Sequence, residues 1–106
     1  NLNSYTYVVR PGSYELLFIN QKTLGVAPGT VAGDKCYRAF FGREEPCAAC
    51  PMQDLREGVS QSRREIYNDL LDIWTETTAS LVDWTDDERC CLLNCIDISE
   101  YKPQGK

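Results

Sequence analysis

Five segments of the chain carry the hydrophobic pattern of β-strands, either alternating apolar and polar residues or a short apolar run. Residues 5–9 and 14–19 form the first two, separated by the turn residues Arg10–Ser13. After Gly58 the pattern returns over residues 64–68, 73–84 and 89–98, with Thr85–Glu88 as the turn between the last two. The sequence therefore predicts an opening antiparallel pair and three further strands.

Residues 20–58 have a different pattern. Glycine and proline interrupt residues 20–34, so we expect only short helical turns there. Residues 35–41 predict a short helix that ends at Gly42 and places Cys36, Tyr37 and Phe40 near one face. We expect a second helix over residues 52–57, ended by Gly58.

Both parities of the long fourth strand carry large apolar residues. One parity holds Trp74, Val82 and Trp84, and the other holds Ile73, Ala79 and Leu81. Since side chains alternate along a strand, neither face of the sheet is wholly polar. This pattern predicts a sheet that is covered on both sides.

Composition restricts the partners. The chain has 106 residues, a common size for one domain, and no apolar run near the roughly 20 residues that cross a membrane. Its net charge is −5, and twelve of its sixteen acidic residues lie in residues 54–106. Nucleic acid and anionic lipid attract basic surfaces, so we expect neither nucleic-acid binding nor direct membrane contact.

The chain contains no histidine, which excludes a histidine general base, a histidine phosphoacceptor and histidine-ligated haem or zinc. It contains six cysteines. Cys90 and Cys91 are neighbours on a predicted strand and point to opposite faces, which is awkward for a framework of disulfides. We therefore expect free thiols and a reducing, cytoplasmic location.

The sharpest chemical motif is Cys47-x-x-Cys50, enclosed by Pro46 and Pro51. Three interpretations stay open: small thiols packed against the sheet, a redox disulfide, or a metal or iron-sulfur site. A metal site made of thiols would use Cys36, Cys47 and Cys50 as three of its ligands. The fourth ligand would be one of the cysteines in the last predicted strand, Cys90, Cys91 or Cys95. Packing is the preferred interpretation, so no metal is favoured.

The order of elements, two strands, several short helices and three strands, resembles that of PAS sensor domains. Gly33–Gly42 followed by Pro46-Cys47-x-x-Cys50-Pro51 is similar to a bacterial PAS subgroup with a Cys-Tyr helix and a Pro-Cys-x-x-Cys loop. Asp97-Ile98-Ser99 is similar to the Asp-Ile-Thr/Ser segment that closes many PAS domains. Glu88 stands where many of them have the glycine of an Asp-Gly-Arg turn.

The resemblance implies an α+β fold, a five-stranded antiparallel sheet with short helices between strands two and three. It implies that residues 1–106 are one non-catalytic sensory domain, cut from a longer bacterial signalling protein, with residues 99–106 beginning an exit linker. The effector in the same polypeptide would be a kinase, a diguanylate cyclase or a transcription regulator. A homodimer is also implied.

Candidate sites follow from the same interpretation. A small-molecule ligand would contact aromatic residues, namely Tyr37, Phe40, Phe41 and Trp74. Signal relay would use Asp97, Ile98 and Ser99, with Arg89 or Arg10 as a partner for the Asp97 carboxylate. The sequence requires no cofactor, and it does not identify one that the domain would bind. The alternatives are a cysteine-based metal or iron-sulfur redox sensor and a pure PAS dimerisation module.

Overall fold

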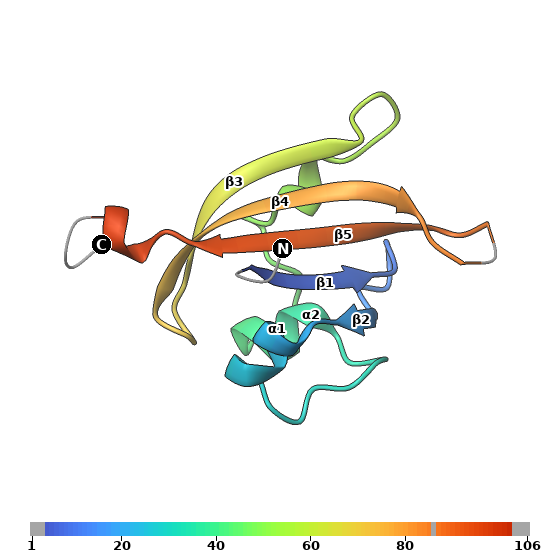
Figure 1. The fold of residues 1–106 in the computed structure, drawn as a ribbon. Helices are drawn as coiled ribbons and strands as arrows, with labels where there is room; N and C mark the ends of the chain where they lie inside the picture. The colour runs from blue at the N-terminus through green and yellow to red at the C-terminus, as the bar shows by residue number, and fades with distance from the viewer. Residues whose placement is uncertain (1–3, 86, 103–106) are drawn as a thin grey trace.

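The computed structural model describes residues 4–85 and 87–102, which form one five-stranded antiparallel sheet with short helices (Figure 1). The strands are β1 (Tyr5–Val9), β2 (Leu16–Ile19), β3 (Gln61–Asn68), β4 (Ile73–Asp83) and β5 (Arg89–Asp97). Their order in the sheet is β2-β1-β5-β4-β3, so β1 and β5 are neighbours. The predicted α+β class and five-stranded antiparallel sheet are confirmed.

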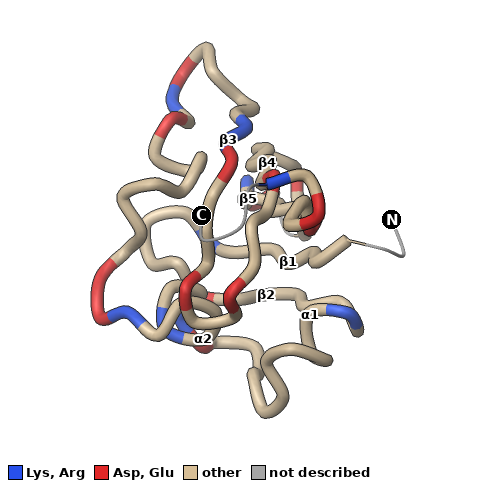
Figure 2. The backbone as a smooth tube through the Cα atoms, turned by 90° about the vertical axis from the view of Figure 1, so that its left-hand side faces the viewer, with Lys and Arg blue, Asp and Glu red and all other residues tan. Residues whose placement is uncertain are grey.

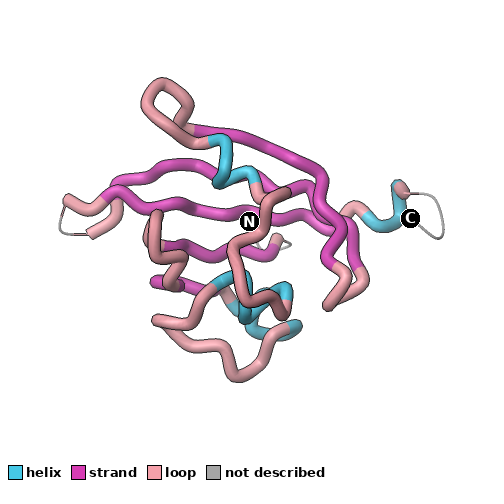
Figure 3. The backbone as a smooth tube through the Cα atoms, turned by 180° about the vertical axis from the view of Figure 1, so that it is seen from behind, coloured by secondary structure: helices cyan, strands magenta, loops and turns pink. Residues whose placement is uncertain are grey.

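The connection between β2 and β3 holds α1 (Gln21–Val26), α2 (Cys36–Phe41) and the 3₁₀ helix η1 (Pro51–Asp54). Figure 3 shows this connection from behind, lying over one face of the sheet, which we call the inner face. A second 3₁₀ helix, η2 (Ser99–Tyr101), follows β5. Neither described α-helix has the length or apolar content needed to cross a bilayer.

The core lies between the inner face and α2. Phe40 of α2 packs its ring 4.6 Å, centroid to centroid, from that of Tyr7 in β1. The buried members of this core are Tyr7, Val9, Leu16, Cys36, Phe40, Ala79, Cys91, Leu93 and Cys95. Removing this apolar surface from water is the main favourable contribution to folding.

Gly42 ends α2, as the sequence predicts. Its φ of 66° lies in the left-handed region, which glycine adopts without the clash of a Cβ atom. The N–H of Arg43 then donates to the carbonyl of Tyr37 at 3.1 Å, which satisfies a carbonyl at the helix end. The chain can therefore turn sharply toward the loop that contains Cys47 and Cys50, residues 46–51, which we call the cysteine loop.

β2 begins at Leu16, two residues later than predicted, because the preceding backbone pairs with the segment before α2. The N–H of Leu16 donates to the backbone carbonyl of Asp34 at 2.9 Å, and the N–H of Cys36 donates to the backbone carbonyl of Tyr14 at 3.1 Å. These bonds also attach the start of α2 to the sheet.

The helix predicted over residues 52–57 is wrong, since only the 3₁₀ turn of η1 forms. The Asp54 carboxylate accepts hydrogen bonds from Ser62 Oγ at 2.6 Å and Arg64 Nε at 2.9 Å, both on β3. These bonds hold the pKa of Asp54 down at about 2. β3 itself starts at Gln61, earlier than predicted, because its polar first residues pair with β4.

The turn between β4 and β5 forms without glycine. Asp87 has a φ of 60°, a conformation that aspartate tolerates better than most residues. Glu88 accepts from Arg10 Nε at 2.5 Å, which attaches this turn to the turn between β1 and β2. Figure 2 shows basic and acidic residues spread over many parts of the chain.

Asn68 connects α2 to the turn between β3 and β4. Its amide donates to the carbonyl of Phe40 at 3.0 Å, and its Oδ1 accepts from the N–H groups of Leu70 and Leu71, both at 3.1 Å. We expect Asn68→Ala to lower the free energy of unfolding by about 2–4 kcal/mol, because it leaves buried groups without partners. Urea unfolding measures the loss. Asp69, which is exposed, provides the control, since Asp69→Ala should lower the free energy of unfolding by no more than about 0.5 kcal/mol. Equal losses in the two variants would contradict the structural role of the Asn68 hydrogen bonds.

Candidate functional site

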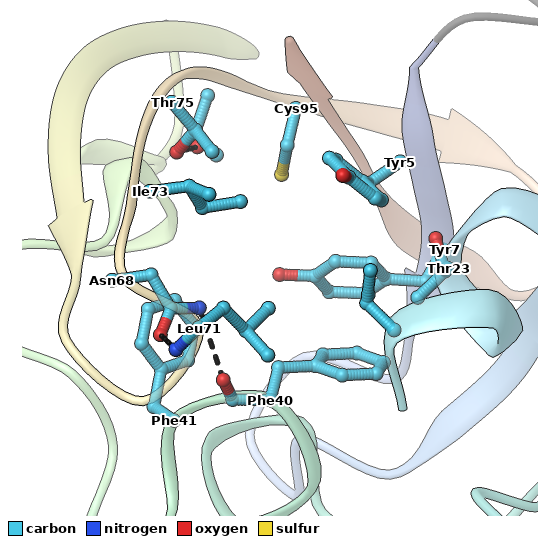
Figure 4. Close-up of a pocket in the computed structure, with 12 residues that line it drawn as sticks. Tyr5, Tyr7, Thr23, Phe40, Phe41, Asn68, Leu71, Ile73, Thr75 and Cys95 are labelled. Carbon is cyan, nitrogen blue, oxygen red and sulfur yellow. Dashed lines mark hydrogen bonds between the residues drawn. The ribbon is translucent and has the colours of Figure 1, made fainter. Parts of the chain in front are cut away.

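A cavity of about 30 Å³ lies between the inner face of the sheet, α1, α2 and the turn after β3 (Figure 4). One buried water needs roughly 10–15 Å³ by this kind of measure, so the cavity has room for about two waters or one very small molecule. None of its lining side chains is acidic or basic. They are Tyr5, Tyr7, Thr23, Val26, Phe40, Phe41, Asn68, Leu71, Ile73, Thr75, Thr77 and Cys95.

Hydroxyl and thiol groups line the sheet side of the cavity. Thr75 Oγ1 lies 2.9 Å from Thr77 Oγ1 and donates to the carbonyl of Ile66 at 3.4 Å. The hydroxyls of Thr77 and Tyr7 lie within hydrogen-bonding reach of the Cys95 thiol. In Figure 4 the Tyr7 hydroxyl and the Cys95 sulfur both point toward the open centre.

Burial keeps these groups protonated. It raises the pKa of Cys95 to about 11 and raises the pKa of Tyr7 well above its ordinary value. The cavity therefore presents neutral hydrogen-bonding groups among apolar walls at neutral pH.

Two of the four aromatic residues that the sequence proposed for a ligand site line this cavity, namely Phe40 and Phe41. Tyr37 instead packs edge-on against Tyr14, with ring centroids 5.7 Å apart. Trp74 does not line the cavity either, although its neighbours in β4 do, because successive side chains of a strand point to opposite faces. Tyr37 and Trp74 thus lie outside this cavity.

Sequence reasoning missed the polar side of the cavity, formed by Tyr7, Thr75, Thr77 and Cys95. These residues share the inner face because Tyr7 pairs with Leu93 and Thr77 pairs with Cys95. Their parity within each strand was visible in the sequence, but the register between strands was not.

The cysteine loop lies beside the core. Cys36 is buried in the core cluster, Cys50 packs against that cluster, and Cys47 is half-buried. Burial and the charges that Cys50 and Cys47 would carry raise the pKa of Cys36 far above its ordinary value. Burial also raises the pKa of Cys47 to about 11. Burial therefore favours the protonated form of these thiols at neutral pH.

All six cysteines are free. Within residues 4–85 and 87–102, no three acidic or cysteine side chains are arranged to hold a metal ion. A thiol must ionise to attack an oxidant or a disulfide, so the raised pKa values also disfavour a reactive redox pair. Cys36 is a member of the buried core, and Cys50 packs against it.

The segment after β5 folds back on the start of β4. The N–H of Ile98 donates to the carbonyl of Trp74 at 2.8 Å, and the N–H of Trp74 donates to Ser99 Oγ at 2.9 Å. Lys102 places its Nζ 4.7 Å from the centre of the Trp74 ring and also pairs with Glu65. The segment after β5 therefore folds back instead of running straight on from the strand. Residues 103–106 lie outside the described chain.

Asp97, the first of the proposed relay residues, is exposed, and its Oδ1 accepts from the N–H of Ser99 at 2.9 Å. The partners expected for it are wrong. Arg10 pairs with Glu88 and Glu15, and Arg89 pairs with Asp83. Asp97 thus shapes the exit turn locally and forms no ion pair with either arginine.

Comparisons of this chain with known protein families, with curated proteins and with solved structures found no match.

The protonated state of the loop thiols makes their reactivity testable. At pH 7.5 we expect Cys47 to react with iodoacetamide at least about tenfold more slowly than a free thiol of ordinary pKa, since far less of it is thiolate. Because a raised pKa delays ionisation, the rate should keep rising to about pH 10. Mass spectrometry of the labelled peptide gives the rate, and the urea-unfolded chain is the control. A rate that levels off below pH 9 would contradict a raised pKa.

Proposed function

We propose that this chain is a non-catalytic, PAS-like sensory domain that detects a small molecule in its inner-face cavity. The presence of the ligand would be relayed to the effector through the exit segment, residues 98–102. The five-stranded antiparallel sheet with helices inserted after the second strand supports this proposal. So does a cavity between that sheet and those helices. The setting proposed is a cytoplasmic bacterial signalling protein with an effector in the same polypeptide.

One observation carries the proposal: the start of β4 contacts both the cavity and the exit. Ile73 and Thr75 line the cavity, while the backbone of Trp74 between them holds the exit through Ile98 and Ser99. A strand segment that moves to accommodate a ligand at Ile73 and Thr75 necessarily moves Trp74. The exit would then change its attachment.

The energies are compatible with switching. Each of the two hydrogen bonds between Trp74 and the exit contributes roughly 0.5–1.5 kcal/mol, so releasing both costs on the order of 1–3 kcal/mol. A ligand shifts such an equilibrium by its difference in affinity for the attached and released states. A difference of about tenfold to a hundredfold is enough.

Binding is preferred to catalysis because burial holds the thiol and the phenol of the cavity in their protonated forms. A general base or nucleophile would need a lowered pKa. The thiol-based alternatives have less support, because the cysteine loop assembles no metal ligand set within the described chain and its thiols are protonated.

The relay predicts that filling the cavity loosens the exit. Thr77→Ile adds bulk inside the cavity, and we expect hydrogen exchange at the Trp74 amide to accelerate at least about tenfold relative to the Leu93 amide, in the centre of the sheet. NMR-detected exchange measures both sites. Thr78→Ile places the same side chain on the opposite face and should leave the ratio within about twofold. If both variants change the ratio equally, or neither does, the relay is excluded.

We further propose that the chain self-associates through the outer face, opposite the helices. An outer apolar patch lies there, made of Phe18, Val82, Trp84, Leu92 and Ile96. Phe18 is 44% exposed and Ile96 is 39% exposed, although both are large and apolar. The sequence pattern predicted a sheet covered on both sides. The helices cover the inner face, and a second copy of the chain would cover the outer apolar patch.

Sedimentation velocity tests self-association over a range of concentrations up to about 100 μM. We expect Ile96→Lys to shift the protein to the monomer, because a charge in the contact loses its water. Val31→Lys, in an exposed loop, is the matched control and should leave the dimer intact. A wild-type chain that stays monomeric throughout contradicts this proposal.

A further inference from the structure

We propose that the cavity binds a small, uncharged molecule that donates one hydrogen bond to the phenolic oxygen of Tyr7. This inference rests on the proposed sensory function and names the chemical class of its ligand. Three properties of the cavity lead to it: charge, the direction of its hydrogen bonds, and size.

The first property is charge. No acidic or basic side chain of the described residues lines the cavity, and charged groups near it include two at the Tyr5 ring. There the Lys22 ammonium lies 4.9 Å from the centre of the Tyr5 ring, and burial together with the Asp97 carboxylate raises the pKa of Tyr5. An ionised ligand deep in the cavity would lose its hydration without gaining a partner of opposite charge, which is strongly unfavourable. The ligand is therefore uncharged.

The second property is the direction of the hydrogen bonds on the sheet side. The Thr75 hydroxyl donates its only proton to the carbonyl of Ile66. In its 2.9 Å contact with Thr77, Thr75 must then accept, so Thr77 is the donor. Thr77 therefore has no second proton to give to the Cys95 sulfur.

The Tyr7 hydroxyl also lies within reach of the Cys95 sulfur. Because Thr77 has no proton left for this sulfur, Tyr7 is its donor. The Tyr7 proton is then directed at Cys95, and the Tyr7 oxygen keeps lone pairs that can accept a further hydrogen bond. Figure 4 shows this oxygen directed at the open centre. A hydroxyl or N–H group on the ligand satisfies it, whereas a ligand that only accepts hydrogen bonds does not.

The third property is size. A cavity of about 30 Å³ holds only a few heavy atoms, unless α1 moves. Such movement is inexpensive, because α1 has six residues of which Thr23 alone is buried. Probes of four heavy atoms therefore suit the first test, and their small contact area limits affinity to roughly the millimolar range.

Four probes of the same branched shape separate the requirements. Propan-2-ol is uncharged and donates a hydrogen bond, acetone is uncharged and only accepts, acetate is an anion, and isopropylammonium is a cation. Titrations of the ¹⁵N-labelled chain follow the amides of the lining residues and of residues 98–102. We expect propan-2-ol to bind at least about fivefold more tightly than acetone, and the two ions to cause no saturable shift at the lining residues.

Two tyrosine variants locate the contact. Tyr7→Phe keeps the ring that packs on Phe40 and removes only the acceptor, so the preference for propan-2-ol over acetone should disappear. Tyr37→Phe removes a hydroxyl outside the cavity and should keep the preference. Dispersed amide spectra show whether each variant is folded. A preference that survives in folded Tyr7→Phe overturns the assignment of Tyr7.

The outcomes distinguish this inference from the proposed function. If an ion binds the cavity and shifts residues 98–102, the ligand class is wrong and the relay stands. If propan-2-ol binds with the expected preference and the exit amides do not respond, the ligand class stands and the relay fails. If no probe shifts the lining amides up to about 100 mM, the ligand class is overturned.

Discussion

The antiparallel pairing of β1 with β5 is the constraint on which the rest of the structure depends. It joins segments from the two ends of the described chain, as in the 3.1 Å hydrogen bond between Thr6 and Asn94, 88 positions apart. It also sets the register that places Tyr7 opposite Leu93 and Tyr5 opposite Cys95. A slip of β1 by one residue would turn the Tyr7 side chain to the outer face, away from Cys95, and disrupt both core and cavity.

That register explains why a buried surface can contain so many polar groups. Thr75 and Thr77 are each less than a tenth exposed, yet they bond to one another, to a backbone carbonyl and to the Cys95 thiol. Buried hydroxyls are costly only when they lack partners. The inner face thus combines an apolar core with a neutral polar row, and the cavity lies along that row.

The alternation of side chains along β4 gives the proposed relay its physical basis. Ile73 and Thr75 face the cavity, and the backbone between them binds the exit, so the two regions share one short strand segment. No long pathway through the core is needed. The Trp74 side chain, on the opposite face, lies against Lys102 and adds a further contact with the exit.

Local patterns determined the part of the fold that depends on neighbouring residues. Alternation predicted the strands, and Gly42 marked the end of α2, because both effects act within a few positions of the chain. The prediction of a helix over residues 52–57 was wrong because the Asp54 carboxylate accepts hydrogen bonds from Ser62 and Arg64 on β3, 8 and 10 positions further along the chain. The apolar pattern of residues 52–57 does not show this contact.

The candidate site divides in the same way. The absence of histidine, readable from the sequence, excluded a histidine general base and histidine-ligated metal. Phe40 and Phe41 were expected at a cavity and lie there, but Tyr37 and Trp74 do not. Only the tertiary structure brought Tyr7 and Cys95 to the cavity and kept them protonated, because strand register and burial arise from residues far apart in the chain.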